Sequence, residues 1–234
     1  MGGQVVSERL LETVEIETAP SPELAVIWLH GLGADGHDFE PIVPELGLEV
    51  PTRFVFPHAP VRAVTINNGR RMRAWYDISG FSGAQEDAPG VRASASAVAR
   101  LVDREVERGV PAARIVLAGF SQGGAIALHL GLRENRRVGG IIALSTYLPL
   151  PATLPSEISA VSQGLPIFMA HGSADPVIPI ELAEASRQAL EREGCPVEWH
   201  VYPMAHSVCV DEIRGIAGWL TRLASARVLS GDES

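Results

Sequence analysis

Short runs of apolar residues alternate along this chain with longer stretches in which apolar residues recur at helical spacing. This alternation constrains the fold most, because a strand buried on both faces of a parallel sheet is apolar at nearly every position. The expected strands are 24–29, 53–56, 114–118, 140–144, 166–170 and 198–202, of which the middle four are continuous apolar runs. A weaker segment, 12–18, alternates polar and apolar residues and is expected at a sheet edge.

The stretches between these runs have helical periodicity. One apolar stripe runs from Val91 to Val106, and Gly109 and Pro111 end that helix. Further helices are expected over 122–133, over 180–193 and along an apolar stripe at 213–224. Strands that alternate with helices predict an α/β fold with a mostly parallel central sheet flanked by helices on both faces. The 234 residues suit one domain, 1–234. Within it, the segment 60–90 shows neither strand nor helix periodicity, and we expect it to be functional.

Composition excludes several classes of function. The formal net charge is −9, which argues against nucleic acid as a partner because such binding depends on Lys and Arg. No apolar run is long enough to cross a bilayer, so we expect no stable membrane insertion. The N-terminus lacks the features of a signal peptide, and the cytoplasm is the expected location. The two cysteines, Cys195 and Cys209, are too few for a disulfide framework and are expected to be free thiols.

A G-x-S-x-G motif at 119–123 places Ser121 directly between an expected strand and an expected helix. This strand–turn–helix setting is what a nucleophile elbow requires, since the sharp turn exposes the serine hydroxyl at the end of the strand. Gly119 and Gly123 suit it because the turn leaves no room for a Cβ atom. The sequence therefore predicts Ser121 as a nucleophile.

A serine needs a base to take its proton, and in this arrangement an acid and then a histidine follow it along the chain. His206 is the histidine that lies in a loop after the last expected strand, whereas His129, His171 and His200 fall within or at the end of regular elements. Asp175 is the carboxylate in the loop after the preceding strand. Its role would be to fix the tautomer of His206, and the alternative is a helix-capping aspartate.

The loop after the first buried strand offers backbone donors for an oxyanion. We expect one donor to be the N–H of Gln122 and the other the N–H of Leu32. The same loop, 31–36, also fits the dinucleotide-binding pattern G-x-G-x-x-G. That reading needs an acidic residue at the end of the next strand, and the run 53–58 has none, so we reject it.

Together these residues resemble the phospholipase/carboxylesterase family, which includes bacterial carboxylesterases and acyl-protein thioesterases. The resemblance spans roughly residues 24–225 and rests on five motifs: HGLGADG at 30–36, RAWYDI at 73–78, GFSQGG at 119–124, HGSADPVIP at 171–179 and YPMAHSVC at 202–209. It implies the α/β-hydrolase fold, the triad Ser121, Asp175 and His206, and a segment at 60–90 that covers the active site. Ser173 and Ala205 depart from the residues that are usual in the family, which puts fine substrate preference in doubt.

The resemblance implies a serine carboxylesterase that cleaves short to medium acyl esters of small molecules, without a cofactor or metal. Met72, Trp75, Ile78 and Phe81 are candidates for an apolar wall along the acyl chain, and the alternative for Trp75 is a place in the core. The motifs leave an acyl-protein thioesterase or a lysophospholipase open, because the same residues serve all three reactions. A non-catalytic ligand-binding relative also stays open, since a fold alone does not establish function. The sequence leaves a homodimer open as well.

Overall fold

The computed structural model describes residues 10–80 and 86–226. These residues form a seven-stranded sheet in the order β1-β3-β2-β6-β7-β8-β9. All neighbouring strands in it are parallel except β1, which pairs with β3 in the antiparallel direction. The strands are β1 (Thr13–Glu17), β2 (Leu24–Leu29), β3 (Thr52–Pro57), β6 (Ile115–Phe120), β7 (Gly140–Leu144), β8 (Ile167–Gly172) and β9 (Val197–Tyr202). A separate pair of antiparallel strands is formed by β4 (Val61–Val64) and β5 (Arg70–Arg73).

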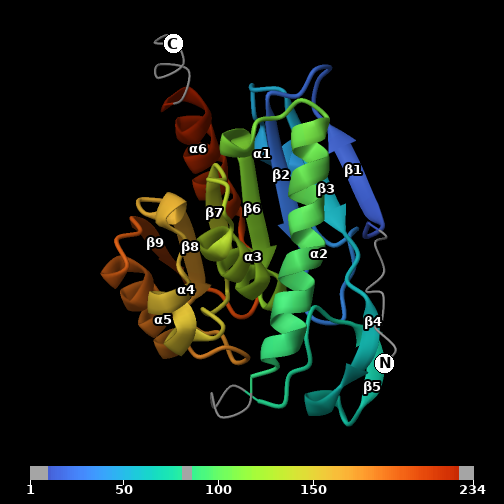
Figure 1. The fold of residues 1–234 in the computed structure, drawn as a ribbon, viewed down its shortest axis with the longest axis vertical. Coiled ribbons are helices and arrows are strands. Elements are labelled where there is room, and N and C mark those ends of the chain that lie inside the picture. The colour runs from blue at the N-terminus through green and yellow to red at the C-terminus, as the bar shows by residue number, and fades with distance from the viewer. Residues whose placement is uncertain (1–9, 81–85, 227–234) are drawn as a thin grey trace, which may run out of the picture.

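Helices cover both faces of this sheet (Figure 1). The α-helices are α1 (Val43–Leu46), α2 (Ala88–Glu107), α3 (Gln122–Arg133), α4 (Leu154–Glu157), α5 (Ile180–Arg192) and α6 (Val210–Ala226). Residues of α2, α3 and α5 pack in one hydrophobic cluster, and residues of α1 and α6 pack in another on the opposite face. The two clusters draw alternate residues from the strands, such as Ile27 for the first and Trp28 for the second. The fold is thus the predicted α/β-hydrolase fold, with a mostly parallel central sheet between two helical layers.

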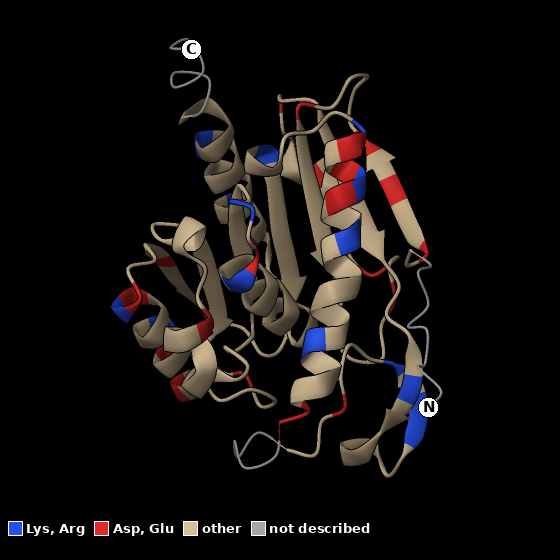
Figure 2. Ribbon diagram, in the orientation of Figure 1, with Lys and Arg blue, Asp and Glu red and all other residues tan. Residues whose placement is uncertain are grey.

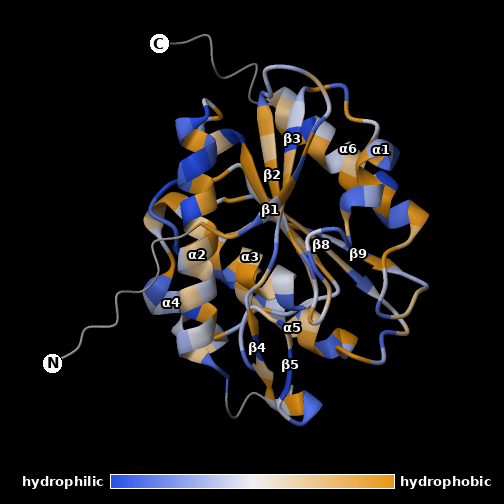
Figure 3. Cartoon of the chain, turned by 90° about the vertical axis from the view of Figure 1, so that its right-hand side faces the viewer, coloured by the Kyte–Doolittle hydropathy of each residue, from blue (hydrophilic) through white to orange (hydrophobic). Residues whose placement is uncertain are grey.

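The central strands owe their position to their uniform composition. Every residue of β2 and β7 is buried. Figure 2 shows no charged residue on β2, β6 or β7, and Figure 3 shows β2 as predominantly hydrophobic. Such strands are stable only in the middle of a covered sheet. The alternating segment forms β1 at the sheet edge, as its pattern predicts.

The segment 60–90 differs from the irregular connection that we expect from its sequence. It contains the hairpin β4–β5, and α2 begins within it at Ala88. Asn68 and Gly69, in the hairpin turn, have positive φ angles of 55° and 73°. An Asn-Gly pair is a strong hairpin signal because both residues tolerate such angles. The prediction of an irregular segment was wrong here, because the Asn-Gly pair allows a tight turn between two short strands.

Glu212 is fully buried in the first turn of α6. Burial raises the pKa of its carboxyl group from 4.5 to about 8. Below pH 4.5 both the folded and the unfolded chain hold this proton. Between pH 4.5 and 8 the unfolded chain releases it and the folded chain keeps it, so the free energy of unfolding falls as the pH rises.

We therefore expect Glu212→Gln to gain stability over the unmodified protein as the pH rises from 5 to 8. Each unit of pKa difference corresponds to about 1.4 kcal/mol, so the gain amounts to a few kcal/mol. Urea unfolding of both proteins at pH 5 and at pH 8 measures it. Asp211→Asn is the matched control, because Asp211 is the neighbouring acid and its side chain is exposed. Parallel pH dependence in Glu212→Gln and the unmodified protein would contradict the prediction.

Candidate active site

Ser121 occupies a strained turn between β6 and α3. Its φ of 53° and ψ of −121° lie in a region that residues with a side chain seldom adopt. The surrounding backbone holds this conformation, since the Ser121 N–H donates to the Leu144 carbonyl at 2.8 Å and the Thr146 hydroxyl donates to the Ser121 carbonyl at 2.6 Å. Strain of this kind persists only where neighbouring structure imposes it, and it is concentrated at functional sites.

The two glycines of the motif are required by close backbone contacts. A Cβ atom on Gly123 would lie 2.3 Å from the carbonyl oxygen of Leu29, and one on Gly119 would lie 2.4 Å from the backbone of Gly123. Neither contact could relax without moving a strand or the helix, so no other residue fits. The loop after β2 and the start of α3 consequently touch at Gly123.

His206 and Asp175 form a hydrogen-bonded pair. The distance from His206 Nδ1 to Asp175 Oδ2 is 2.7 Å, and the other carboxylate oxygen accepts from the backbone N–H groups of Val177 and Ile178 at 2.8 and 2.9 Å. Burial raises the pKa of Asp175, but these hydrogen bonds, first the one from His206, outweigh it and hold the pKa below its ordinary value of 3.8. An ionised carboxylate only accepts, so Nδ1 of His206 donates, and a neutral ring then has no proton on Nε2.

Phe120 packs against His206, and His171 supports the loop that carries Asp175. The ring of Phe120 packs against the His206 ring with centroids 4.7 Å apart. Beneath the acid loop, His171 is fully buried, and its Nε2 donates to the Ile178 carbonyl at 2.9 Å. His171 thus supports the loop that carries Asp175, whereas the contact of Phe120 with His206 has no signal in the sequence.

A cavity of about 260 Å³ opens beside Ser121 and His206. Its apolar lining consists of Leu32, Ala34, Ile78, Phe120, Val177 and Ile178. Its remaining lining consists of Gly31, Asp38, Tyr76, Ser121, Gln122, Tyr147 and His206. The structure thus brings Ser121, His206, Leu32 and Gln122 to one cavity, with Asp175 hydrogen-bonded behind His206. An apolar pocket that meets a few polar groups is the usual form of a small-molecule site.

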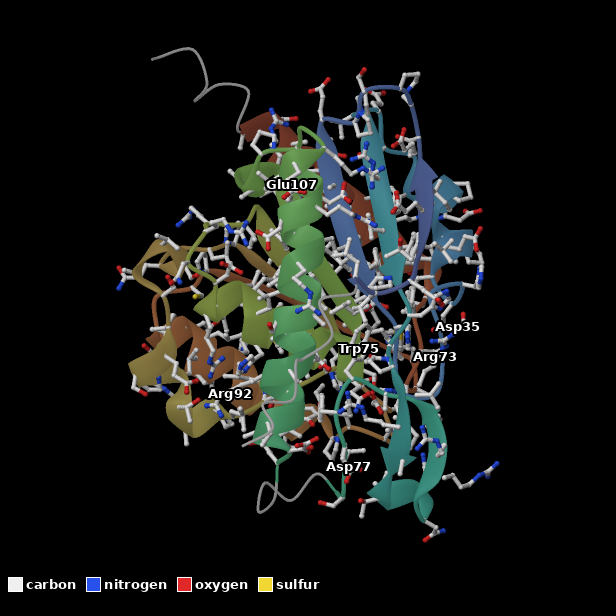
Figure 4. All side chains as sticks on the ribbon, turned by 45° about the vertical axis from the view of Figure 1, so that its right-hand side comes forward. Asp35, Arg73, Trp75, Asp77, Arg92 and Glu107 are labelled. Carbon is white, nitrogen blue, oxygen red and sulfur yellow. The ribbon has the colours of Figure 1, made fainter. Side chains whose placement is uncertain are left out.

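The four candidates for the apolar wall have different positions. Ile78 lines the cavity. Met72 packs with Leu32 and Ile78 but is not part of the lining. Trp75 does not line it either, because its side chain is fully buried and faces the interior (Figure 4). The prediction of Trp75 as wall is therefore wrong, and Phe81 lies outside the described residues.

Two tyrosines complete the wall, and sequence reasoning missed both. The hydroxyl groups of Tyr76 and Tyr147 are 2.8 Å apart. Burial raises the pKa of each phenol above its ordinary value. Tyr76 lies in the recognised motif at 73–78, which could have signalled it, whereas Tyr147 follows β7 without any motif. The pair gives this part of the cavity neutral hydroxyl groups.

Within 10–80 and 86–226, no group of three or more His, Cys, Asp or Glu side chains is arranged to hold a metal ion. Over the same ranges, no helix combines the length and the apolar character needed to cross a membrane.

The fold and this arrangement of side chains define the class of the protein, an α/β-hydrolase. Residues 11–223 match the family model described as Phospholipase/Carboxylesterase, and the chain belongs to that family. It is similar to acyl-protein thioesterase 1 of Neurospora crassa, with 38% identity over 84% of this chain and 85% of the relative. It is also 36% identical to acyl-protein thioesterase 1 of Yarrowia lipolytica, over 88% of this chain and 95% of the relative.

The crystal structure of SOBER1 from Arabidopsis thaliana matches with a TM-score of 0.82 and 30% identity, over 86% of this chain and 98% of SOBER1. Family membership makes the protein a hydrolase of ester bonds in the broad sense.

Proposed function

We propose that the protein is an acyl thioesterase that also hydrolyses carboxylic esters, through a covalent intermediate on Ser121. The observation that supports it best is the apolar cavity beside Ser121 and the His206–Asp175 pair. The sequence by itself favours a carboxylesterase. The similarity to acyl-protein thioesterases over most of the chain favours the thioester as the bond cleaved.

In the proposed mechanism, Ser121 Oγ attacks the carbonyl carbon of the substrate while His206 Nε2 takes its proton. The backbone N–H groups of Leu32 and Gln122 stabilise the oxyanion that forms. His206 then protonates the departing thiolate or alkoxide, and the acyl group remains on Ser121. Water activated by His206 repeats the sequence and releases the acid. Asp175 stays ionised throughout and keeps the proton of His206 on Nδ1.

The cavity supports a short to medium acyl group. Its volume of about 260 Å³ is close to the lower end of the range for drug-sized ligands, which begins near 300 Å³. Each methylene group that enters the apolar lining contributes about 0.8 kcal/mol, a factor of about four in kcat/KM. That gain stops when the lining is filled, and further methylene groups stay in water.

The charge beside the cavity affects which leaving groups the site favours. Asp38 is exposed and also belongs to the lining, and the net charge of the chain is −9. The Asp38 carboxylate disfavours anionic leaving groups, because like charges repel over about 8 Å at physiological ionic strength. We therefore expect neutral or cationic thiols to be better leaving groups than the phosphorylated thiol of coenzyme A.

A matched series of thioesters and oxygen esters, from acetyl to palmitoyl on the same small neutral leaving group, tests the proposal. We expect kcat/KM to rise about fourfold per methylene group at first and to level off or fall before palmitoyl, with thioesters at least as good as esters. Acyl-coenzyme A substrates of the best chain length should be poorer than the neutral thioester, and the difference should shrink at high salt.

Other outcomes would change the assignment. A steady rise out to palmitoyl would contradict the length limit that the cavity imposes. A strong preference for esters over thioesters of equal chain length would favour the carboxylesterase that the sequence predicts. No turnover of any member by protein that also fails to react with a fluorophosphonate would overturn the proposed function.

A further inference from the structure

Trp75 connects the two backbone segments that carry the proposed oxyanion donors. Its side chain has no exposed surface. The indole N–H donates to the carbonyl of His30 at 2.9 Å, and the backbone N–H donates to Oε1 of Gln122 at 2.8 Å. Both contacts are buried. One residue therefore holds the loop after β2 and the first residue of α3 at the same time.

The contact with Gln122 is part of a closed pair of hydrogen bonds. While Oε1 of Gln122 accepts from Trp75, its Nε2 donates to the carbonyl of Tyr76 at 2.8 Å. The side-chain amide thus binds the segment 75–76 as a strand partner would, which fixes the side chain of Gln122 relative to that segment. The carbonyl of Trp75 is itself held by the hydroxyl of Ser94 on α2.

The contact with His30 holds the other donor segment. The His30 carbonyl belongs to the peptide that leads into Gly31 and Leu32. The His30 ring supports the same loop, because its Nε2 accepts from the Ala59 N–H at 3.0 Å, which leaves the proton on Nδ1 for the Gly31 carbonyl at 2.7 Å. Burial lowers the pKa of His30 to about 4, so the ring is neutral at neutral pH. Two contacts thus fix the loop at His30: the Trp75 indole binds the His30 carbonyl, and the Ala59 N–H binds the His30 ring.

Oxyanion stabilisation depends on donors that are already in place when charge develops. Misplacement by about 1 Å can cost about a hundredfold in rate. If the indole N–H were removed, the buried His30 carbonyl would lose its partner, and the loop would shift to find another. Substrate binding depends on the apolar lining, to which Trp75 does not belong.

We propose that Trp75 is a positioning residue for the oxyanion hole, which sets the backbone N–H groups of Leu32 and Gln122 through hydrogen bonds to His30 and Gln122. It acts without touching the substrate. This inference rests on the proposed hydrolase function and adds a residue to its machinery.

The test is Trp75→Phe, which keeps an aromatic ring in the core and removes the indole N–H. We expect kcat to fall about 10- to 100-fold with KM within about threefold, because only the transition state uses the donors. The affinity for a trifluoromethyl ketone, whose adduct with Ser121 carries an oxyanion, should fall by a similar factor. A purely structural role would lower the melting temperature without moving kcat and inhibitor affinity together.

Trp28→Phe is the matched control. Trp28 is equally buried in β2, on the opposite face of the sheet, and its indole N–H has no hydrogen-bond partner among the described residues. We expect it to leave kcat and inhibitor affinity unchanged. Gln122→Met is a second variant, which keeps the backbone donor and removes both side-chain hydrogen bonds, and it should reproduce the pattern of Trp75→Phe even if Trp75→Phe does not fold.

Two results would overturn the inference. One is a Trp75→Phe or Gln122→Met protein with unchanged kcat and inhibitor affinity. The other is a change confined to KM, which would place Trp75 in substrate binding. Both differ from failure of the proposed function, in which the unmodified protein neither hydrolyses esters nor reacts with a fluorophosphonate.

Discussion

Replacing Ser121 with alanine is expected to lower kcat for acyl ester and thioester hydrolysis by at least about 10⁴-fold. The fold should remain, because the hydrogen bonds that hold this turn use the backbone N–H and carbonyl of Ser121. Alanine also keeps the Cβ atom, so the positive φ of 53° costs no more than it does for serine. Turnover of the preferred substrate and a thermal melt, measured on the same preparation, check both statements.

Ser145→Ala is the matched control for this variant. Ser145 is also buried, follows the neighbouring strand β7 and has a positive φ of 45°. We expect it to keep kcat within a few fold of the unmodified protein and to react with a fluorophosphonate, whereas Ser121→Ala should not react. Turnover at the unmodified rate by Ser121→Ala would mean that another group is the nucleophile.

The strands and long helices could be predicted because each pattern has one physical solution. A continuous apolar run such as Gly140–Leu144 is stable only in the middle of a covered parallel sheet. The same topology places the carboxyl ends of β6, β8 and β9 on the same side of the sheet. Ser121, Asp175 and His206 follow these strand ends, so all three could be chosen from their loop positions alone. Their proposed roles in catalysis remain predictions until the variants are measured.

The walls of the cavity could not be predicted in the same way. Tyr147 reaches the cavity from a loop after β7 whose path depends on packing against Tyr76. Trp75 carries an aromatic ring that suits a substrate wall as well as a core, and only the position of its hydrogen-bond partners decides between them. Side chains that act through tertiary contacts have no periodic signal, so sequence patterns identify them poorly.

Replacing Asp175 with asparagine is expected to lower kcat by about 10³- to 10⁴-fold while the protein stays folded. The reason lies in the orientation that the loop imposes on this side chain. One carboxylate oxygen accepts from the backbone N–H groups of Val177 and Ile178, and the other faces Nδ1 of His206 at 2.7 Å.

An asparagine must place its carbonyl oxygen toward the two backbone donors, because its NH₂ group can only donate there. The NH₂ group then faces Nδ1 of His206 and donates to it. His206 consequently becomes an acceptor at Nδ1 and carries its proton on Nε2, where it cannot take the proton of Ser121. The variant thus keeps the loop and its shape but holds the base in the wrong tautomer.

Asp175→Ala separates the tautomer effect from the simple loss of an acid. Alanine removes the carboxylate oxygen that accepts from the Val177 and Ile178 N–H groups, so we expect the melting temperature to fall, whereas Asp175→Asn should melt close to the unmodified protein. In Asp175→Ala the His206 ring is free to choose either tautomer, so it should retain more of kcat per folded molecule than Asp175→Asn. The proton on Nδ1 or Nε2 can be assigned directly from the ¹⁵N chemical shifts of His206. A kcat for Asp175→Asn within tenfold of the unmodified protein, or a His206 proton that stays on Nδ1, would show that Asp175 does not set the tautomer of the base.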